Sequence, residues 1–531
     1  MKLSCKILLL SFCFLLNSLS NYSFAQIPKD NTDDFIINVL KGSPDWFQQI
    51  VYNPQEYQVQ IVYTQINRDS SNRAHFETHT FQADEFYFYP ASWMKLPLAV
   101  FSLEKLNELK LNKNDLLKIE PLFGNHNHEY DDFKNIQPPS FAQMIKQAFI
   151  VSDNSVYNPL YDFVTQQRAN QRFAELNLKK AVICNRFSIS EPTEHRHSNF
   201  LEITSNTKEP KVLYQQIQTF NPVQPHCTFA DYNFGEKHYE KGVLVDGPKN
   251  FYYNNYIPIT EMNEMMKKLF FPKETHSTFN LTKDDYTFLK KYLAILPRQC
   301  TQPKYNEAEY PDCYMKYFMI GGSKERLDGS IRIFDKLGQY FGWTCDAAYI
   351  VDYANGVEFF LSAVIYTNSK HEVADNPTEY ANIAAPFFAQ LGKSFYDYEL
   401  KRKKKISPHF NFVSLTMDDG VETKDVEMKP KLMEEKKATV ASIAAHKTVA
   451  LKKELPKSTA ATTVAKNIAH KTGTAKKAAA AQPKHIQQDT VHHAITAKHS
   501  TMVHHQPIHH HKKKATAAKT QHKAAIAKPA N

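Results

Sequence analysis

The chain has 531 residues, of which 42% are hydrophobic and 23% are charged, so it is long and apolar enough to build a large core and is not disordered throughout. Its net charge of +10 is unevenly spread, because residues 401–531 hold 26 of the 65 Lys and Arg residues but only 9 of the 55 Asp and Glu residues. After the N-terminus no stretch holds 18 uncharged apolar residues, so we expect no membrane span.

The first 25 residues have the features of a secretory signal peptide. Lys2 and Lys6 supply its positive charge, and the apolar stretch 7–16 is too short to span a bilayer comfortably. Residues 23–25 follow the small-x-small pattern of a cleavage site, so we expect cleavage before Gln26. The sequence therefore predicts an exported protein, periplasmic or extracellular.

The body of the chain, 26–400, alternates between patterns that are typical of strands and of helices. Strands are expected at 57–65, 76–81, 86–88, 331–334, 347–353 and 357–366. Helices are expected at 33–40, 96–109, 141–151, 156–164, 171–176, 260–269 (with Thr260 as the N-cap) and 381–391. Because helices lie between a first and a last group of strands, we predict an α+β fold in which N- and C-terminal strands share one antiparallel sheet beside a helical subdomain.

A serine and a lysine stand three residues apart where the helix at 96–109 begins. In Ser92-Trp93-Met94-Lys95 the spacing places the amine and the hydroxyl on one helical face. A hydroxyl becomes a good nucleophile when a neighbouring base takes its proton, and a buried lysine with a lowered pKa can be that base. The motif alone is weak, because it recurs by chance in long chains.

A second motif, Ser152-Asp153-Asn154, follows the apolar helix at 141–151. The order and spacing of the two motifs resemble those of the class A β-lactamases and the penicillin-binding proteins. The resemblance implies an exported serine hydrolase with the fold predicted above and no cofactor.

The family's third motif, Lys-Thr-Gly on a strand, has two candidates. Residues 471–473 match it letter by letter, but they lie in a Lys- and Ala-rich segment that has nothing to hold a catalytic group rigidly. Residues 336–338 have Leu337 in place of Thr, yet they open a β-rich region that a closing helix follows. We therefore expect Lys336 and Gly338 to be the working element.

The resemblance implies a role for each of these residues. Ser92 would be the nucleophile, Lys95 its proton acceptor, and Ser152 would pass a proton to the leaving nitrogen. The substrate would be held by Asn154, by Lys336, which would attract a carboxylate, and by the strand at Gly338 and Gln339. The backbone N–H groups of Ser92 and Gln339 would form the oxyanion hole.

The sequence departs from the family at two positions. Leu337 lacks the hydroxyl that Thr offers to a β-lactam carboxylate. The Glu-x-x-Leu-Asn sequence that supplies the base for deacylation in class A enzymes is not present, and Glu191 in 186–194 is the nearest candidate. A solvated loop glutamate is the alternative, and then the acyl-enzyme would turn over slowly, as in a penicillin-binding protein.

An insertion around 200–302 makes the separation of the second and third motifs much longer than in compact class A enzymes. It forms either a wall over the site or a peripheral addition that never touches the substrate.

Five cysteines remain after the signal peptide: Cys184, Cys227, Cys300, Cys313 and Cys345. Export permits a Cys300–Cys313 bridge, and the alternative is that all five are small buried apolar residues.

The segment 401–531 is predicted to be a disordered basic tail, because after Met433 it is mostly Ala, Lys, Thr, His and Gln. It holds 13 of the 23 histidines, but a flexible histidine run does not fix metal geometry, so we expect no metal site. Its charge favours anionic envelope polymers as partners, while export argues against nucleic acid.

Together these features predict an enzyme that acylates Ser92 with a small-molecule or peptide-like substrate, in the first place a β-lactam. Two alternatives remain: a D,D-peptidase or esterase on the same fold, and a non-catalytic protein that binds the cell envelope.

Overall fold

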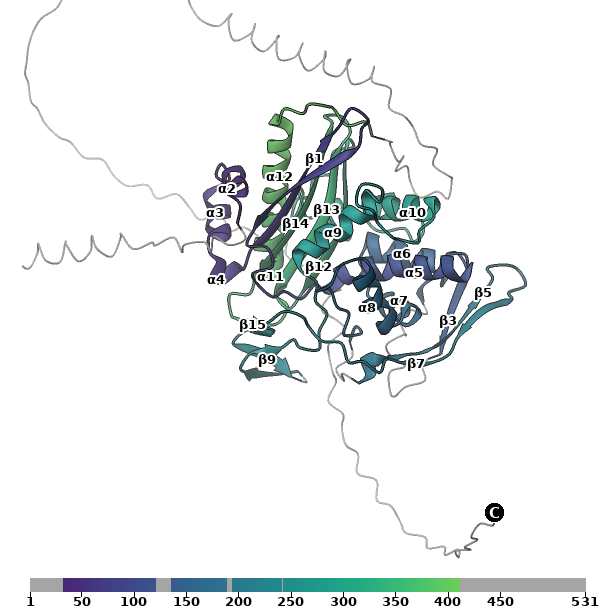
Figure 1. Ribbon diagram of the computed structural model, residues 1–531. Helices are drawn as coiled ribbons and strands as arrows, with labels where there is room; N and C mark the ends of the chain where they lie inside the picture. The colour runs from purple at the N-terminus through teal and green to yellow at the C-terminus, as the bar shows by residue number, and fades with distance from the viewer. Residues whose placement is uncertain (1–31, 121–134, 189–192, 241, 411–531) are drawn as a thin grey trace, which may run out of the picture. The chain divides into compact units, whose positions relative to one another are not determined.

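A five-stranded antiparallel sheet forms the centre of the computed structural model, which describes residues 32–120, 135–188, 193–240 and 242–410 (Figure 1). The strand order is β12-β13-β14-β1-β2. The strands are β1 (Gln60–Arg68), β2 (Ala74–Phe81), β12 (Ile331–Tyr340), β13 (Trp343–Asp352) and β14 (Val357–Tyr366). Because N-terminal β1 pairs with C-terminal β14, the predicted α+β class and the shared sheet are confirmed.

Alternation along the strands separates two apolar cores, one on each face of the sheet. On β14, Phe359 and Leu361 belong to one core, whereas Phe360 and Val364 belong to the other. The first core is covered by α2 (Asp34–Leu40), α3 (Asp45–Val51) and α12 (Ala385–Lys401). Figure 1 shows α12 and α9 on opposite faces of the sheet.

The second core joins the sheet to the helical part of the molecule, where the predicted motifs lie. Helix α9 packs on β1, β13 and β14, and α5 packs on α6 and α7. The helices of this side are α5 (Lys95–Leu109), α6 (Phe141–Ile150), α7 (Tyr157–Val164), α8 (Gln166–Glu175), α9 (Ile259–Phe270) and α10 (Lys283–Ala294). Since α9 and α10 fall within 200–302, part of the proposed insertion belongs to the core.

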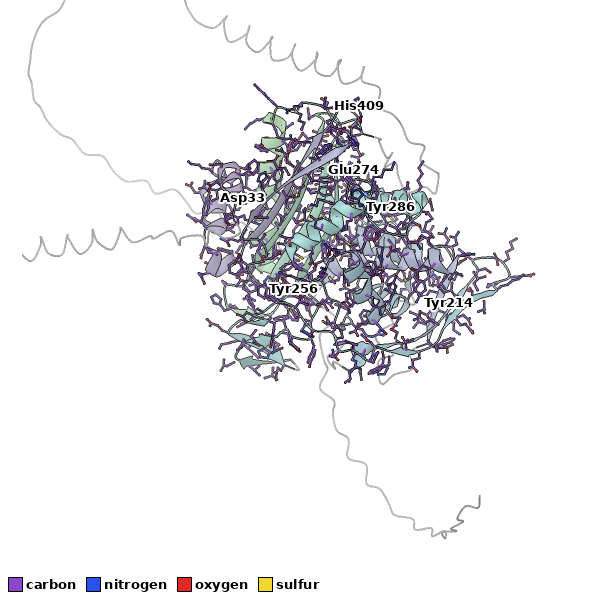
Figure 2. The ribbon with its side chains drawn as sticks, in the orientation of Figure 1. Asp33, Tyr214, Tyr256, Glu274, Tyr286 and His409 are labelled. Atoms are coloured by element: carbon purple, nitrogen blue, oxygen red, sulfur yellow. The ribbon has the colours of Figure 1, made fainter. Side chains whose placement is uncertain are left out.

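Short strands account for the rest of that region. Within the described residues they form four small sheets, β3-β5-β6, β4-β7, β8-β11 and β10-β9-β15, and these sheets also include β3, β4 and β15 from outside 200–302. Their bounds are β3 (Leu116–Glu120), β4 (His197–Ser198), β5 (Phe200–Thr204), β6 (Val212–Gln216), β7 (Thr219–Phe220), β8 (Asn233–Phe234), β9 (Lys237–Glu240), β10 (Val243–Asp246), β11 (Lys249–Asn250) and β15 (Glu372–Val373). In Figure 2, Tyr214 marks the β5–β6 hairpin, which projects away from the central sheet. The described residues also form α4 (Pro54–Tyr57), α11 (Pro377–Glu379), the π-helical turn Tyr380–Ala384 and the short 3₁₀ helices η4 (Glu194–Arg196), η5 (Pro297–Gln299) and η6 (Asp312–Tyr314).

Two local predictions are wrong. Residues 86–88 form no strand, because Gln82 and Asp84 have φ angles of 48° and 62° and turn the chain away from the sheet, while Phe88 is buried by packing alone. The N-cap of α9 is Pro258 rather than Thr260. The Thr260 hydroxyl instead donates to Asp84 Oδ2 at 2.5 Å.

The cysteines and the first residues beyond 400 complete the fold. No disulfide joins any of the five described cysteines, so the Cys300–Cys313 bridge is not formed. Arg402 pairs with Glu399, and His409 exchanges hydrogen bonds with Asn72, so the folded part extends beyond the predicted boundary at 400.

In the ranges that the structure describes, no helix has both the length and the apolar character needed to cross a membrane.

Candidate active site

Ser92 lies on a short 3₁₀ helix, η1 (Ala91–Met94), that leads directly into α5. Ala91 has a φ of 47°, a strained value for a residue with a side chain, and it follows Pro90. Trp93 and Met94 are fully buried and anchor the turn, while Ser92 remains partly exposed. The turn therefore presents the serine hydroxyl at the surface of a rigid core.

The Lys95 ammonium is 1% exposed and contacts four oxygen atoms. Its Nζ lies 3.0 Å from Ser92 Oγ, 2.5 Å from the Ser152 carbonyl oxygen, 2.6 Å from Asn154 Oδ1 and 3.3 Å from Ser152 Oγ. Burial, followed by the charge of Lys336, holds the pKa of Lys95 well below its usual value. The two motifs thus meet at one amine.

The loop after α6 places the second motif. Ser152 has a φ of 56°, an uncommon conformation that turns its carbonyl and hydroxyl toward Lys95. Asp153 holds this turn, because its Oδ1 accepts hydrogen bonds from the backbone N–H and the hydroxyl of Ser155, at 2.9 and 2.7 Å. Asp153 is therefore structural in its contacts, whereas Ser152 and Asn154 face the amine.

Lys336 reaches the same hydroxyl from the sheet. It is fully buried on β12, and its Nζ donates to Ser152 Oγ at 2.9 Å and to the Leu337 carbonyl at 2.6 Å. Burial lowers the pKa of Lys336 to about 7, against the attraction of Asp335 and Asp346. The strand-borne lysine thus occupies the place expected of the third motif, and the tail residues 471–473 lie outside the described residues.

Gly338 allows β12 to approach the serine turn. A Cβ at this position would lie 2.2 Å from the Pro90 carbonyl oxygen and 3.0 Å from the Trp93 nitrogen, so no side chain fits. The Cys345 thiol, opposite Gly338 on β13, lies 3.5 Å from the same Pro90 oxygen. Gln339 follows Gly338 on β12. Its side-chain Nε2 donates a hydrogen bond to Thr344 Oγ1 at 3.0 Å.

Leu337 and Glu191 are the positions at which the sequence departs from the motifs of the class A β-lactamases. Leu337 is buried opposite Asp346 and offers only its backbone carbonyl to Lys336. Glu191 lies outside the described residues. The flanks of its loop are tied to α7: Arg186 pairs with buried Asp162, and the Tyr161 hydroxyl donates to the His195 carbonyl at 2.5 Å.

Two buried carboxylates behind Lys336 were not predicted from the sequence. Asp335 on β12 pairs with buried Lys316, whereas neither carboxylate oxygen of Asp346 accepts a hydrogen bond from a described residue. Burial, and then the Asp335 charge, raise the pKa of Asp346 well above its usual range. The available signal was an acidic residue in the middle of each of these two strands.

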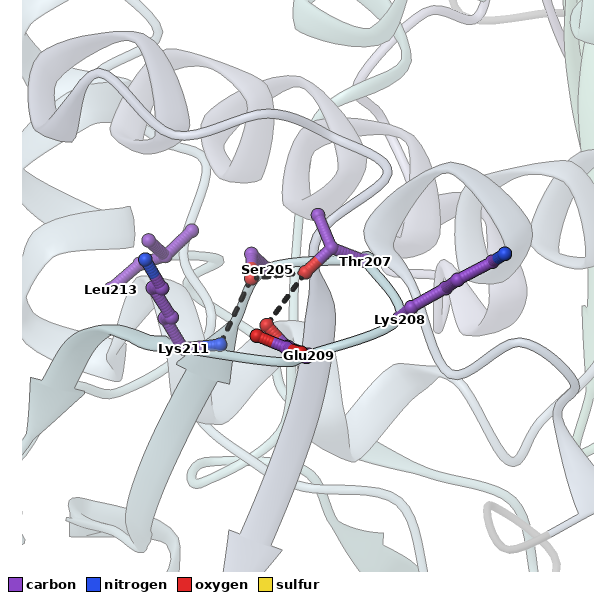
Figure 3. Close-up of a pocket in the computed structure, with 6 residues that line it drawn as sticks. All are labelled: Ser205, Thr207, Lys208, Glu209, Lys211 and Leu213. Atoms are coloured by element: carbon purple, nitrogen blue, oxygen red, sulfur yellow. Dashed lines mark hydrogen bonds between the residues drawn. The ribbon is translucent and has the colours of Figure 1, made fainter.

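Other features of the described residues lie apart from this site. The hollow in Figure 3 is lined by the turn between β5 and β6, where Ser205 and Thr207 hydroxyls lie 3.1 Å apart, and it contains none of the predicted site residues. Nowhere in the described ranges do three or more His, Cys, Asp or Glu side chains gather as a metal ion would require.

Comparisons with known proteins address the same part of the chain. Residues 46–215 match the family described as "Beta-lactamase enzyme family". Similar solved structures include the TLA-1 extended-spectrum β-lactamase, with 15% identity and a TM-score of 0.39 over 69% of this chain and 97% of that chain. PBP-A has 14% identity and a TM-score of 0.40 over 71% of this chain and 100% of that chain. A PBP-A variant, solved as an acyl-enzyme complex with penicillin G, has 15% identity and a TM-score of 0.40 over 69% and 97%.

No relative was found among curated proteins. The family match includes Ser92, Lys95, Ser152 and Asn154 and ends before Lys336. The match of residues 46–215 to the β-lactamase enzyme family agrees with the resemblance of the motifs.

Proposed function

We propose that the protein is an exported serine hydrolase that forms an acyl-enzyme at Ser92, with β-lactams as its foremost substrates. The observation that carries this proposal is the set of contacts around Lys95. A neutral amine has two N–H donors and one lone pair. The Ser152 carbonyl and Asn154 Oδ1 can only accept, so they take the two donors, and the lone pair is left for the Ser92 hydroxyl.

Acylation then needs no group beyond those described. Ser92 Oγ attacks the substrate carbonyl carbon while its proton passes to Lys95 Nζ, 3.0 Å away. The oxyanion is stabilised by the backbone N–H groups of Ser92 and Gln339. As the C–N bond breaks, the leaving nitrogen takes a proton from Ser152 Oγ, which is resupplied by Lys95 at 3.3 Å.

The cation of Lys336 supports recognition of a substrate carboxylate. It donates to Ser152 Oγ, and it is the nearest positive charge on the strand that borders Ser92. A carboxylate next to Ser152 would accept from both side chains. This arrangement favours β-lactams and peptides with a C-terminal carboxylate over simple esters.

Deacylation decides between a β-lactamase and a penicillin-binding role. The sequence has no Glu-x-x-Leu-Asn loop, which favours a long-lived acyl-enzyme, whereas Glu191 as a positioned base would give rapid hydrolysis. The D,D-peptidase role is therefore the second candidate.

Intact-protein mass spectrometry after mixing with benzylpenicillin tests the proposal. We expect one adduct of the mass of benzylpenicillin on the peptide that contains Ser92, and none on Ser92→Ala. A persistent adduct would identify a penicillin-binding role, and a transient adduct with released penicilloate would identify a β-lactamase. Absence of any adduct on the wild type, with unchanged binding of Ser92→Ala to cell-wall material, would overturn the enzyme proposal in favour of envelope binding.

A further inference from the structure

The strand β11, within the proposed insertion, brings a lysine to one edge of the candidate active site. Phe251 follows directly after β11, and the Lys249 ammonium lies over the Phe251 ring, so the two side chains are on the same side of the chain. Phe251 is fully buried, with its ring 5.4 Å from Trp343 and 5.7 Å from Phe341. This anchor fixes the position of Lys249.

An aromatic cluster connects Lys249 to the serine turn. The Lys249 ammonium lies 5.4 Å from the centre of the Phe341 ring and 5.8 Å from that of Phe251. Tyr89, three residues before Ser92, packs on both of these rings, at 5.5 and 6.3 Å, and on Tyr340 at 6.1 Å. Tyr89, Tyr340 and Phe341 are all partly exposed, so the cluster forms a surface beside the nucleophile.

The site therefore lies between two cations. On β12, Lys336, Gly338 and Tyr340 alternate onto the same face, and Gly338 touches the serine turn. Tyr340 is four residue steps along the strand from Lys336, a span of about 13 Å. A substrate whose reacting carbonyl lies at Ser92 would extend toward Lys336 at one end and toward Tyr340, Phe341 and Lys249 at the other.

Lys249 has no carboxylate within ion-pair distance among the described residues. The acidic residue whose charge acts on Lys249 is Glu240. The Glu240 side chain is 68% exposed and lies 3.3 Å from His238 Nε2. Burial lowers the pKa of Lys249, and only the more distant Glu240 opposes this. A partly desolvated cation that contacts aromatic rings but no carboxylate is stabilised when an anion approaches it.

We propose that Lys249 is a specificity-determining residue that binds a second anionic group, carried by the acyl part of the substrate on the side of the reacting carbonyl opposite to Lys336. The preferred substrates are then doubly anionic acyl donors, such as β-lactams with a carboxylate in the side chain or peptides with an acidic residue before the reacting bond. This inference rests on the proposed acylation of Ser92, and it gives the insertion a role as a wall of the site.

Two matched pairs of β-lactams test the effect of a second carboxylate, which stands on a short side chain in one pair and on a longer side chain in the other. Carbenicillin is benzylpenicillin with an added side-chain carboxylate, and cefixime is cefdinir with a carboxymethyl group on the oxime. For the wild type we expect faster acylation, per unit concentration, by the doubly anionic member of at least one pair. Lys249→Met should reduce that preference about tenfold and leave acylation by benzylpenicillin and cefdinir unchanged, and Lys249→Arg should retain it.

Lys237→Met is the matched control, because Lys237 lies in the same region, is exposed and pairs with Asp246. It removes the same net charge and should leave the preference unchanged. If Lys249→Met changes neither pair, or if Lys237→Met has the same effect as Lys249→Met, the inference is wrong. Failure of benzylpenicillin to acylate the wild type would instead overturn the proposed function, so the two failures are distinguishable.

Discussion

At the scale of single residues, the two lysines of the site share their chemistry and differ in their surroundings. Lys95 is surrounded by acceptors and by another cation, whereas Lys336 lies near Asp335 and Asp346. Burial lowers both pKa values, that of Lys95 well below its usual value and that of Lys336 to about 7. Close to pH 7 the site can therefore hold a neutral base beside a charged binding group.

This difference predicts how acylation by benzylpenicillin depends on pH. The rate should rise with pH while Lys95 loses its proton, at a pH well below its usual pKa, and fall above about pH 7 as Lys336 loses its charge. In Lys336→Arg the fall of the acylation rate should begin more than one pH unit higher, because a guanidinium stays protonated well above pH 7. The measurement is the acylation rate constant between pH 5 and 10, and superimposable wild-type and Lys336→Arg profiles would contradict the assignment.

Gly338 gives a second prediction at this scale. The added Cβ of Gly338→Ala would meet the Pro90 backbone oxygen at 2.2 Å, and a backbone atom cannot rotate away. β12 must then move from the serine turn, and a displacement of about 1 Å at a reacting group costs on the order of 100-fold in rate. Stopped-flow acylation measures this loss. Gly329→Ala is the control, because a Cβ there meets nothing within 4 Å, and an equal loss in both variants would refute the argument.

At the scale of elements, long periodic segments were predictable and short strands were not. The strong apolar stripe of α6 and the β-branched and aromatic content of β14 located both within one or two residues. Strands of two residues, such as β8 and β11, carry too few positions for a period, and tertiary contacts decide them. For the same reason no pattern in the sequence indicated that Lys249 would lie over the Phe341 ring, on which Tyr89 packs.

The candidate site was predictable where its residues follow motifs. Ser92, Lys95, Ser152, Asn154 and Lys336 come together because each motif sits next to the end of a predicted helix or strand. The buried carboxylates were missed because a single acidic residue in an apolar strand does not reveal its partner. Asp335 and Asp346 become neighbours only through the pairing of β12 and β13.

That pairing predicts how the stability of the fold depends on pH. Because Asp346 has a raised pKa in the folded chain, unfolding releases its proton once the pH exceeds about 4, the ordinary value for Asp. The free energy of unfolding should therefore fall with rising pH, by at most about 1.4 kcal/mol per unit from this group, until the folded pKa is reached. Asp346→Asn carries no such proton and should lose this dependence.

Urea unfolding at pH 4, 6 and 8 measures the effect. We expect Asp346→Asn to gain stability relative to the wild type as pH rises through this interval. Asp246→Asn is the matched control, since the Asp246 side chain is 90% exposed and its pairing with Lys237 contributes little. Parallel pH profiles for the wild type and Asp346→Asn would show that Asp346 is ionised throughout.

At the scale of the whole molecule, composition and structure divide the chain at different points. The basic run that begins at Lys401 suggested a tail, yet its first members neutralise a buried carboxylate. Glu399 is buried within α12, accepts from the Tyr63 hydroxyl at 2.5 Å, and pairs with Arg402 at 2.9 Å and with Lys404 at 3.3 Å. These two basic residues therefore belong to the folded body.

Two truncations turn this difference into a measurement. A chain that ends at Phe410 keeps both partners of Glu399 and the 5.2 Å contact between Phe410 and Tyr353, so its acylation rate and its thermal midpoint should match those of the full chain. A chain that ends at Leu400 leaves Glu399 buried without Arg402 or Lys404, which should cost about 3–5 kcal/mol of stability. Benzylpenicillin acylation and thermal unfolding of both chains check this, and loss of acylation in the Phe410 chain would mean that the tail motif at 471–473, rather than Lys336, completes the site.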